Sequence, residues 1–168
     1  MKKLNDFIKE YGDYIVKDGF MDFLEKPIPK PVWDLKDGDK YFYIDSVGVV
    51  SNILWDNNDE YDILRRNQGN VFLTLEEAEY EVKRRDVYAT VKRYAYEFSN
   101  EEWNDSTIEK YYPYYNYNDY SISKCFNSYT RHSELYFQSK EDIEKAIEAV
   151  GEEDFKKYYF GVKEWKNT

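Results

Sequence analysis

Residues 72–82, FLTLEEAEYEV, mark the point at which an extended segment becomes a helix. Thr74 is followed three positions later by Glu77, the spacing of a capping box, in which the side chain of each residue binds the backbone amide of the other. Glu76 adds negative charge at the positive end of the helix dipole. The sequence therefore predicts a strand entry at Phe72 and a helix that starts at Leu75.

The apolar face of this helix changes along its length. At about 100° per residue, two sets of apolar positions lie on nearly opposite sides of the helix. One set is Leu75, Ala78, Val82 and Ala89, and the other is Val87, Val91, Tyr94 and Phe98. The pattern predicts a helix from Leu75 to about Phe98 that is buried on two sides or broken near Asp86.

A second stretch, residues 137–147, FQSKEDIEKAI, repeats the pattern of residues 72–82. The paired positions are separated by 65 residues: Phe72 and Phe137, Thr74 and Ser139, Glu77 and Asp142, Ala78 and Ile143, Val82 and Ile147, and Arg66 and Arg131. The repetition favours two related ββα units that share one core, with the long helix between them. Chance similarity is the alternative, because a capped helix after a strand is a common arrangement.

Runs of aromatic and β-branched residues predict strands beside these helices. The expected elements are strands at 40–45 and 49–55 joined by a turn, strands at 111–120 and 121–126, a helix that carries Ile143, Ala146, Ile147 and Val150 and ends at Gly151, and a short helical turn within 152–159. Pro113 cannot donate a backbone hydrogen bond and therefore favours an edge strand. The predicted fold class is α+β.

The N-terminal segment differs from the rest of the chain. Residues 4–11 place apolar side chains at helical spacing, whereas Pro27, Pro29 and Pro31 exclude a helix and favour an extended connector. We expect three parts: residues 1–31 as a helical appendage with its connector, residues 32–98 as the first ββα unit, and residues 99–168 as the second.

Two features of the composition bear on function. The 168 residues carry a formal net charge of −10, and 20% of them are aromatic, including 19 tyrosines. An acidic surface repels nucleic acid and anionic membranes and attracts basic partners. Tyrosine gives a large contact area with few rotatable bonds, which suits binding surfaces as well as half-exposed strands.

The sequence also indicates a compartment. No run of about eighteen apolar residues occurs, so no membrane span is expected. Asp6, Lys9 and Glu10 interrupt the apolar segment that an export signal needs. Cys125, the only cysteine, cannot form a disulfide within the chain. We therefore expect a cytoplasmic protein.

Three phrases of the sequence carry a resemblance: residues 33–44, WDLKDGDKYFYI, residues 68–79, QGNVFLTLEEAE, and residues 146–154, AIEAVGEED. In this order they resemble a family of small uncharacterised proteins from bacteriophages and prophages of Gram-positive bacteria. The resemblance implies a phage origin, a bacterial host cell as the location, and an accessory role: inhibition of host restriction or CRISPR systems, regulation, or help in replication. It supplies no catalytic motif.

One segment combines acidic and aromatic side chains. We predict that it binds the lysines and arginines with which a partner protein contacts phosphates. The candidate residues are Glu97, Glu101, Glu102, Trp103, Asp105, Glu109, Tyr112, Tyr114, Tyr115, Tyr117 and Asp119. Stacking of these tyrosines on nucleic-acid bases is disfavoured, because the tyrosine run contains no lysine or arginine until Lys124.

A basic cluster opposes the overall charge. It consists of Arg65, Arg66, Lys83, Arg84, Arg85, Lys92 and Arg93. One interpretation is contact with nucleic-acid phosphates, and the other is a solvated helix face with glutamate pairing. Direct nucleic-acid binding is the less favoured function, because the net charge of −10 opposes it.

Histidine and cysteine give no support for catalysis. His132 is the only histidine and lies in a polar loop, so neither a histidine metal site nor a Ser-His-Asp triad is indicated. Cys125 lies in a strand pattern, without the electropositive surroundings that a reactive thiolate needs. Glu81 and Lys83 resemble part of a nuclease motif but fall within the predicted helix.

Metal and cofactor sites are equally unsupported. The segment with Asp56, Asn58, Glu60 and Asp62 alternates oxygen ligands as a calcium loop does. However, Tyr61 and Asn67 stand where such a loop needs glycine and glutamate. No glycine-rich phosphate loop occurs. The sequence predicts neither a metal nor a cofactor.

The leading prediction is a phage accessory protein that binds a host protein stoichiometrically. It would inhibit a nucleic-acid-targeting defence, as an anti-CRISPR or anti-restriction protein does, by copying the charge of DNA on a basic surface. The alternative is a nucleic-acid-binding replication or regulatory helper that uses the basic cluster, and an enzyme of unrecognised type comes third. The sequence leaves the partner and the oligomeric state open.

Overall fold

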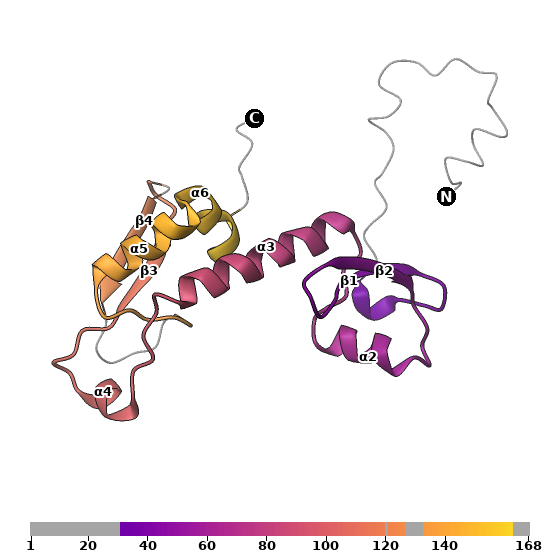
Figure 1. Ribbon diagram of the computed structural model, residues 1–168, viewed down its shortest axis with the longest axis horizontal. Helices are drawn as coiled ribbons and strands as arrows, with labels where there is room; N and C mark the ends of the chain where they lie inside the picture. Colours follow the sequence, from indigo (N-terminus) through magenta and orange to yellow (C-terminus); the bar gives the residue numbers. More distant parts are fainter. Residues whose placement is uncertain (1–30, 120, 127–132, 163–168) are drawn as a thin grey trace, which may run out of the picture. The chain divides into compact units, whose positions relative to one another are not determined.

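The computed structural model describes residues 31–119, 121–126 and 133–162. The chain divides into two compact units, Met1–Asp34 and Leu35–Thr168. In the first unit the described residues contain one 3₁₀ turn, η2 (Val32–Asp34), so the helix predicted at residues 4–11 lies outside the described residues. The second unit is a mixture of helices and two-stranded antiparallel sheets, which confirms the predicted α+β class (Figure 1).

The first hairpin consists of β1 (Lys40–Ile44) and β2 (Val50–Leu54), close to the predicted strands. Its register pairs Lys40 with Leu54 and Ile44 with Val50. On the other side of β1, Phe42 exchanges two backbone hydrogen bonds with Phe72, at 2.8 and 2.9 Å. The strand entry predicted at Phe72 is therefore present as an isolated bridge.

A helix that the sequence prediction lacks, α2 (Glu60–Asn67), follows the first hairpin. No helix is predicted between the strand expected at residues 49–55 and the helix expected from Leu75. Asp59 caps the helix, because its carboxylate accepts a hydrogen bond of 2.8 Å from the backbone amide of Tyr61. Asp62, one turn further on, is buried beneath the helix.

The capping box predicted at Thr74 is confirmed in α3 (Leu75–Lys92). The helix runs unbroken past Asp86, so of the two predicted alternatives the break near Asp86 is wrong. It also ends before the predicted Phe98, because the amide of Tyr96 donates a 2.8 Å hydrogen bond to the carbonyl of Tyr136 and draws the chain away from the helix axis.

Burial on two sides of α3 is confirmed. The helix contacts β1 and β2 as well as α5 (Lys140–Val150) and η3 (Phe155–Tyr159). Ala78 is buried from one of the two predicted faces, and Val87 and Val91 are buried from the other. Leu75 and Ala89 were assigned to the first face but are exposed.

The chain continues through α4 (Asn100–Asn104) to a second hairpin of β3 (Tyr111–Asn116) and β4 (Ser121–Phe126). Tyr111 exchanges backbone hydrogen bonds of 3.0 and 2.9 Å with Phe137, on the side of β3 opposite β4. In an antiparallel ladder, residues two positions apart point their amides the same way, so the nitrogen of Pro113 also faces away from β4. This placement agrees with the predicted edge position of Pro113.

Ser139 caps α5, as predicted: its hydroxyl accepts a 3.2 Å hydrogen bond from the amide of Asp142. The helix ends at Gly151, where φ is +90°, and the short α6 (Glu152–Asp154) and the π-helical turn η3 follow. The main core joins α3, the segment that bridges β3 at Phe137, α5 and η3, and its buried members are Val87, Val91, Leu135, Phe137, Ile143, Ala146 and Phe155. The superposition of the two halves stays a prediction.

Candidate partner-binding surface

The acidic segment, defined here as Glu97–Glu109, is folded around α4. Ser99 and Glu102 form a reciprocal capping box: the amide of Glu102 donates to the Ser99 hydroxyl at 3.2 Å, and the Ser99 amide donates to the Glu102 carboxylate at 2.7 Å. No helix is predicted at this position from the sequence. The spacing of serine and glutamate was the signal that could have found α4.

Lys110 anchors the end of the acidic segment, and sequence reasoning missed it. Its side chain is fully buried, and Nζ donates hydrogen bonds of 2.9 Å to the backbone carbonyls of Asp105 and Ile108. The ammonium also lies 5.6 Å from the ring centre of Trp103 and 6.0 Å from that of Phe98. A buried ammonium is costly unless such groups replace its water, so Lys110 fixes the shape of the loop that follows α4.

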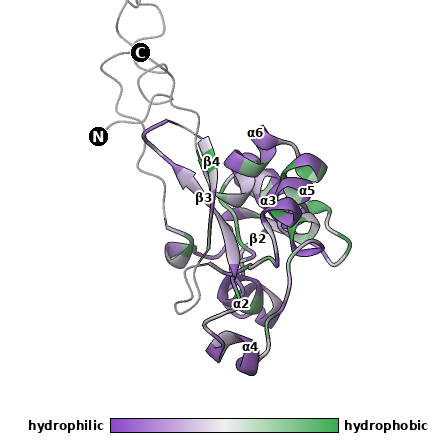
Figure 2. Ribbon diagram, turned by 90° about the vertical axis from the view of Figure 1, so that its left-hand side faces the viewer, coloured by the Kyte–Doolittle hydropathy of each residue, from purple (hydrophilic) through white to green (hydrophobic). Residues whose placement is uncertain are grey.

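The carboxylates of the acidic segment remain largely at the surface. Glu97, Glu101, Asp105 and Glu109 are exposed, and Glu102 is half-buried. Glu97 and Glu101 have no side-chain hydrogen bond or ion pair to any residue that the structure describes, so both are available to a partner. The ribbon of α4 is coloured mostly hydrophilic in Figure 2.

Local hydrogen bonds keep two of these groups ionised. The hydrogen bond from the Ser99 amide holds the pKa of Glu102 below its usual value, with help from the Tyr96 hydroxyl and the charge of Lys110. Hydrogen bonds from the hydroxyl and amide of Thr107 lower the pKa of Asp105 in the same way. These two carboxylates therefore keep their negative charge to a lower pH than an isolated glutamate or aspartate does.

The structure divides the predicted acidic and aromatic surface into two places. The acidic segment precedes β3, whereas Tyr117 and Asp119 lie in the turn at the far end of β3. The six residue steps from Tyr111 to Tyr117 span about 20 Å. We call the second place the hairpin tip; it comprises Tyr114, Tyr115, Tyr117 and Asp119.

Two of the predicted contact residues point into the protein instead. Trp103 is half-buried, with its ring 4.9 Å from that of Tyr136 and 5.9 Å from that of Phe98. Tyr112 is half-buried and lies 5.7 Å from Tyr136. Both stabilise the loop and strand rather than offer exposed area. By contrast, Tyr117 is 67% exposed and Tyr114 is 40% exposed.

The tyrosines of the hairpin line a cavity of about 480 Å³. Tyr112, Tyr114, Tyr115 and Tyr117 form one side, and Arg84 and Glu134 add one charge of each sign. Ring contacts of 4.9 Å between Tyr115 and Tyr117 and 6.0 Å between Tyr115 and Phe160 hold this aromatic wall together.

The basic cluster is largely engaged within the protein. Arg65 and Arg66 belong to α2 and pack on the first hairpin: the Arg65 guanidinium lies 4.0 Å from the ring centre of Tyr43, and that of Arg66 lies 4.7 Å from Trp55. In α3, Arg84 and Arg85 both bind the carboxylate of Glu81, at 2.6 and 2.9 Å. Lys83, Lys92 and Arg93 are exposed.

Glu81 neutralises part of this cluster. Burial opposes a charge on its carboxylate, but the hydrogen bonds from Arg84 and Arg85 outweigh that effect and lower the pKa of Glu81. This pairing agrees with the predicted glutamate-paired helix face. It also reduces the positive charge that α3 could offer to a phosphate backbone.

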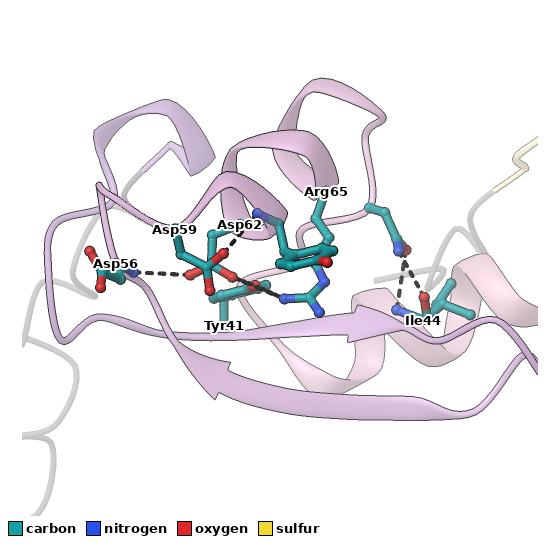
Figure 3. A network of polar contacts seen from close by, with 8 residues as sticks. Tyr41, Ile44, Asp56, Asp59, Asp62 and Arg65 are labelled. Carbon is teal, nitrogen blue, oxygen red and sulfur yellow. Dashed lines mark hydrogen bonds and ion pairs between the residues drawn. The ribbon is translucent and has the colours of Figure 1, made fainter.

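Arg65 belongs to a buried network beneath α2 (Figure 3). The hydroxyl of Tyr41 donates a 2.5 Å hydrogen bond to Asp62, and Nη1 of Arg65 lies 2.9 Å from both groups. The second Asp62 oxygen accepts a 3.0 Å bond from the amide of Asp56. Burial and the bond to Asp62 raise the pKa of Tyr41 to about 12, against the opposing effect of Arg65.

The residues weighed in the sequence analysis as possible metal or catalytic groups lie in secondary-structure elements or outside the described residues. In the calcium-like segment, Asp59 caps α2 and Asp62 joins the network, and no three metal-binding side chains gather among residues 31–119, 121–126 and 133–162. Glu81 and Lys83 lie in α3, as predicted. Cys125 lies in β4, and His132 and Arg131 lie outside the described residues.

Across the same described ranges, no helix combines the length and the apolar character that a membrane crossing requires. Comparison of the chain with protein-family models, with curated proteins and with solved structures finds no match.

Proposed function

We propose that this chain is a phage-encoded accessory protein that acts by stoichiometric binding to a host protein. The acidic segment occupies a basic surface with which the host protein binds nucleic acid. The target is a defence that acts on nucleic acids, of the restriction or CRISPR type.

One observation carries the proposal: the acidic segment is a folded structure whose carboxylates are largely exposed, while the lysine that follows it, Lys110, is buried. The capping box at Ser99 and the two carbonyl contacts of Lys110 hold the backbone. Binding then requires little ordering of the segment, which lowers the entropic cost of association.

The mechanism is the copying of a polyanion's charge. Arginine and lysine side chains that bind phosphates also bind carboxylates, through charge-assisted hydrogen bonds. Complementary fields speed the encounter of the two proteins and select the partner. The exposed tyrosines of the hairpin tip supply a second, aromatic contact, since tyrosine is enriched at protein interfaces.

We also propose that the chain consists of two related units. Two related ββα units place a capped helix after each hairpin, with Thr74 and Ser139 in corresponding positions. In this view the halves have diverged: the first hairpin is closed by α2, while the second is preceded by the acidic segment that binds the partner.

The test is affinity capture from a bacterial host lysate with matched charge variants. Glu97→Lys with Glu101→Lys reverses the two exposed carboxylates that have no contacts among the described residues. Glu79→Lys with Glu148→Lys makes the same change in net charge on exposed positions of α3 and α5. We expect the wild type and the second variant to capture the same nucleic-acid-binding protein, and the first variant to lose it. Equal capture by both variants would refute the acidic segment as the binding surface.

A direct assay separates this function from the alternative of nucleic-acid binding by the basic cluster. The affinity of such a protein for labelled DNA or RNA would fall steeply with salt, because binding releases counterions. Replacing Arg84, Arg85, Lys92 and Arg93 by glutamine would then weaken it. We expect no salt-dependent binding by the wild type, and a salt-dependent affinity that the glutamine variant loses would favour the alternative.

A further inference from the structure

The outer edge of β2 is open. Among the described residues, β2 pairs with β1 on one side and no strand pairs with it on the other. The hydrogen bonds of β1 fix which backbone groups of β2 point outward. Phe42 directs its amide and carbonyl to Phe72, away from β2, so its β2 neighbour Asn52 directs its own groups away from β1.

Because these directions alternate along an antiparallel ladder, Val50 and Leu54 point outward with Asn52. The backbone hydrogen bonds from Trp55 to Asp39 and from Asp45 to Val49 lie at the positions that this alternation requires. The three outward residues are symmetric about Asn52, and their amides and carbonyls form an unpaired row.

The side chains do not protect this edge. Proteins blunt exposed edges with charges or proline, but residues 46–55 contain no Asp, Glu, Lys or Arg in a chain that is 35% charged. Apolar side chains are exposed along and beside the strand, with Leu54 59% exposed, Val49 56% and Ile53 42%. The other hairpin differs, because β4 carries Lys124, which is paired with Glu144.

We propose that the β2 edge binds the β2 edge of a second copy of this chain, antiparallel and centred on Asn52. In this register Asn52 faces Asn52 of the second copy, and Val50 faces Leu54 of the second copy. Each of these pairs exchanges two backbone hydrogen bonds, and every outward group of the row is satisfied. The side chains match as well, since the exposed Leu54 covers the Val50 side chain of the second copy.

The charge pattern favours a second copy over a basic partner. Residues 46–55 carry no charged side chain, so the strands of two copies meet without a charge clash, and a basic strand would find no carboxylate on β2 itself. The charges nearest to Val50 are of both signs, Glu76 and Glu79 with Lys83, and line the cavity beside it. The net charge of −10 on each copy opposes association at long range, and salt screens that repulsion. The dimer therefore strengthens as salt rises. This inference does not depend on the proposed function, because it uses a different part of the chain.

The test is sedimentation equilibrium of the full chain from micromolar to millimolar concentration, at low and high salt. Leu54→Lys places a charge on the edge, and Asn52→Pro removes an outward amide without breaking a bond to β1. Leu64→Lys is the matched control, because Leu64 is 52% exposed on α2, away from the strand. We expect a dimer that high salt strengthens, that the control retains, and that each edge variant weakens at least about tenfold.

Amide hydrogen exchange locates the interface. We expect the amides of Val50, Asn52 and Leu54 to gain protection with rising protein concentration, whereas those of Ser51 and Ile53, which bond to β1, are protected at all concentrations. A monomer at every concentration and salt would overturn the proposal. A dimer that both edge variants leave unchanged, or that does not protect the three outward amides, would overturn it equally.

Discussion

Asp62 and Lys110 are both buried charges, and the protein compensates them in opposite ways. Asp62, beneath α2, is bound by the side chains of Tyr41 and Arg65 and by the amide of Asp56. Lys110, after α4, is bound by two backbone carbonyls and faces two aromatic rings, with no carboxylate within salt-bridge distance among the described residues.

The difference bears on which charges remain for binding. The buried acid uses one arginine of the basic cluster, and Glu81 uses two more. The buried lysine uses carbonyls and therefore leaves the nearby carboxylates to solvent. The first arrangement consumes positive charge, whereas the second presents negative charge, and this asymmetry supports the acidic segment as the working surface.

We expect the largest loss of stability from a substitution of Asp62. Asp62→Ala leaves the buried groups of Tyr41 and Arg65 without their acceptor, and we expect the free energy of unfolding to fall by about 3 to 5 kcal/mol. Denaturant unfolding measures this loss. Asp62→Asn keeps the side-chain volume and one acceptor oxygen and should cost less. A loss below about 1 kcal/mol for Asp62→Ala would mean that the network contributes little.

Lys110→Met tests the contribution of the buried lysine to stability. Methionine keeps most of the volume but removes the donor of the Ile108 carbonyl and one of the two donors of the Asp105 carbonyl, which retains the amide of Ile108. We expect a loss of about 2 kcal/mol. The control is Lys83→Met on the exposed face of α3, expected to change stability by about 0.5 kcal/mol or less. Equal effects of the two substitutions in denaturant unfolding would contradict the anchoring role of Lys110.

The pH dependence of stability tests the Asp62 network in the wild-type protein itself. The pKa of Tyr41 is raised to about 12 in the folded protein from 10.0, so the folded state favours the neutral phenol. This contribution is complete below pH 10 and is lost as the pH rises towards 12, by about 2 kcal/mol. Tyr41→Phe has no phenol to ionise. We expect its stability deficit at neutral pH to shrink over this range, and a constant deficit would count against the network.

The cap of α4 gives the smallest expected effect. Ser99→Ala removes the hydroxyl that binds the Glu102 amide, and we expect a loss of about 1 kcal/mol. Ser106→Ala, at an exposed position in the same segment, is the control and should leave stability nearly unchanged. Thermal unfolding of the two variants measures the difference, and identical melting temperatures would show that the capping box does not hold the acidic segment.

Local signals were predictable from the sequence, and long-range contacts were not. Thr74 and Ser139 were identified as caps because their partners lie three positions away. The same spacing at Ser99 was available for α4 but was overlooked. The partners of Lys110 are backbone carbonyls, which no residue type reveals, and Tyr41 lies 21 positions from Asp62. The end of α3 likewise depends on the carbonyl of Tyr136, which belongs to a distant segment.

The most direct test of the central claim is competition for the captured host protein. Labelled nucleic acid is bound to that protein, and the chain is added in increasing amounts. We predict release of the nucleic acid at one equivalent by the wild type and by the variant with glutamine at Arg84, Arg85, Lys92 and Arg93, but not by Glu97→Lys with Glu101→Lys. Release by the charge-reversed variant, with none by the glutamine variant, would show that the basic cluster is the working surface instead.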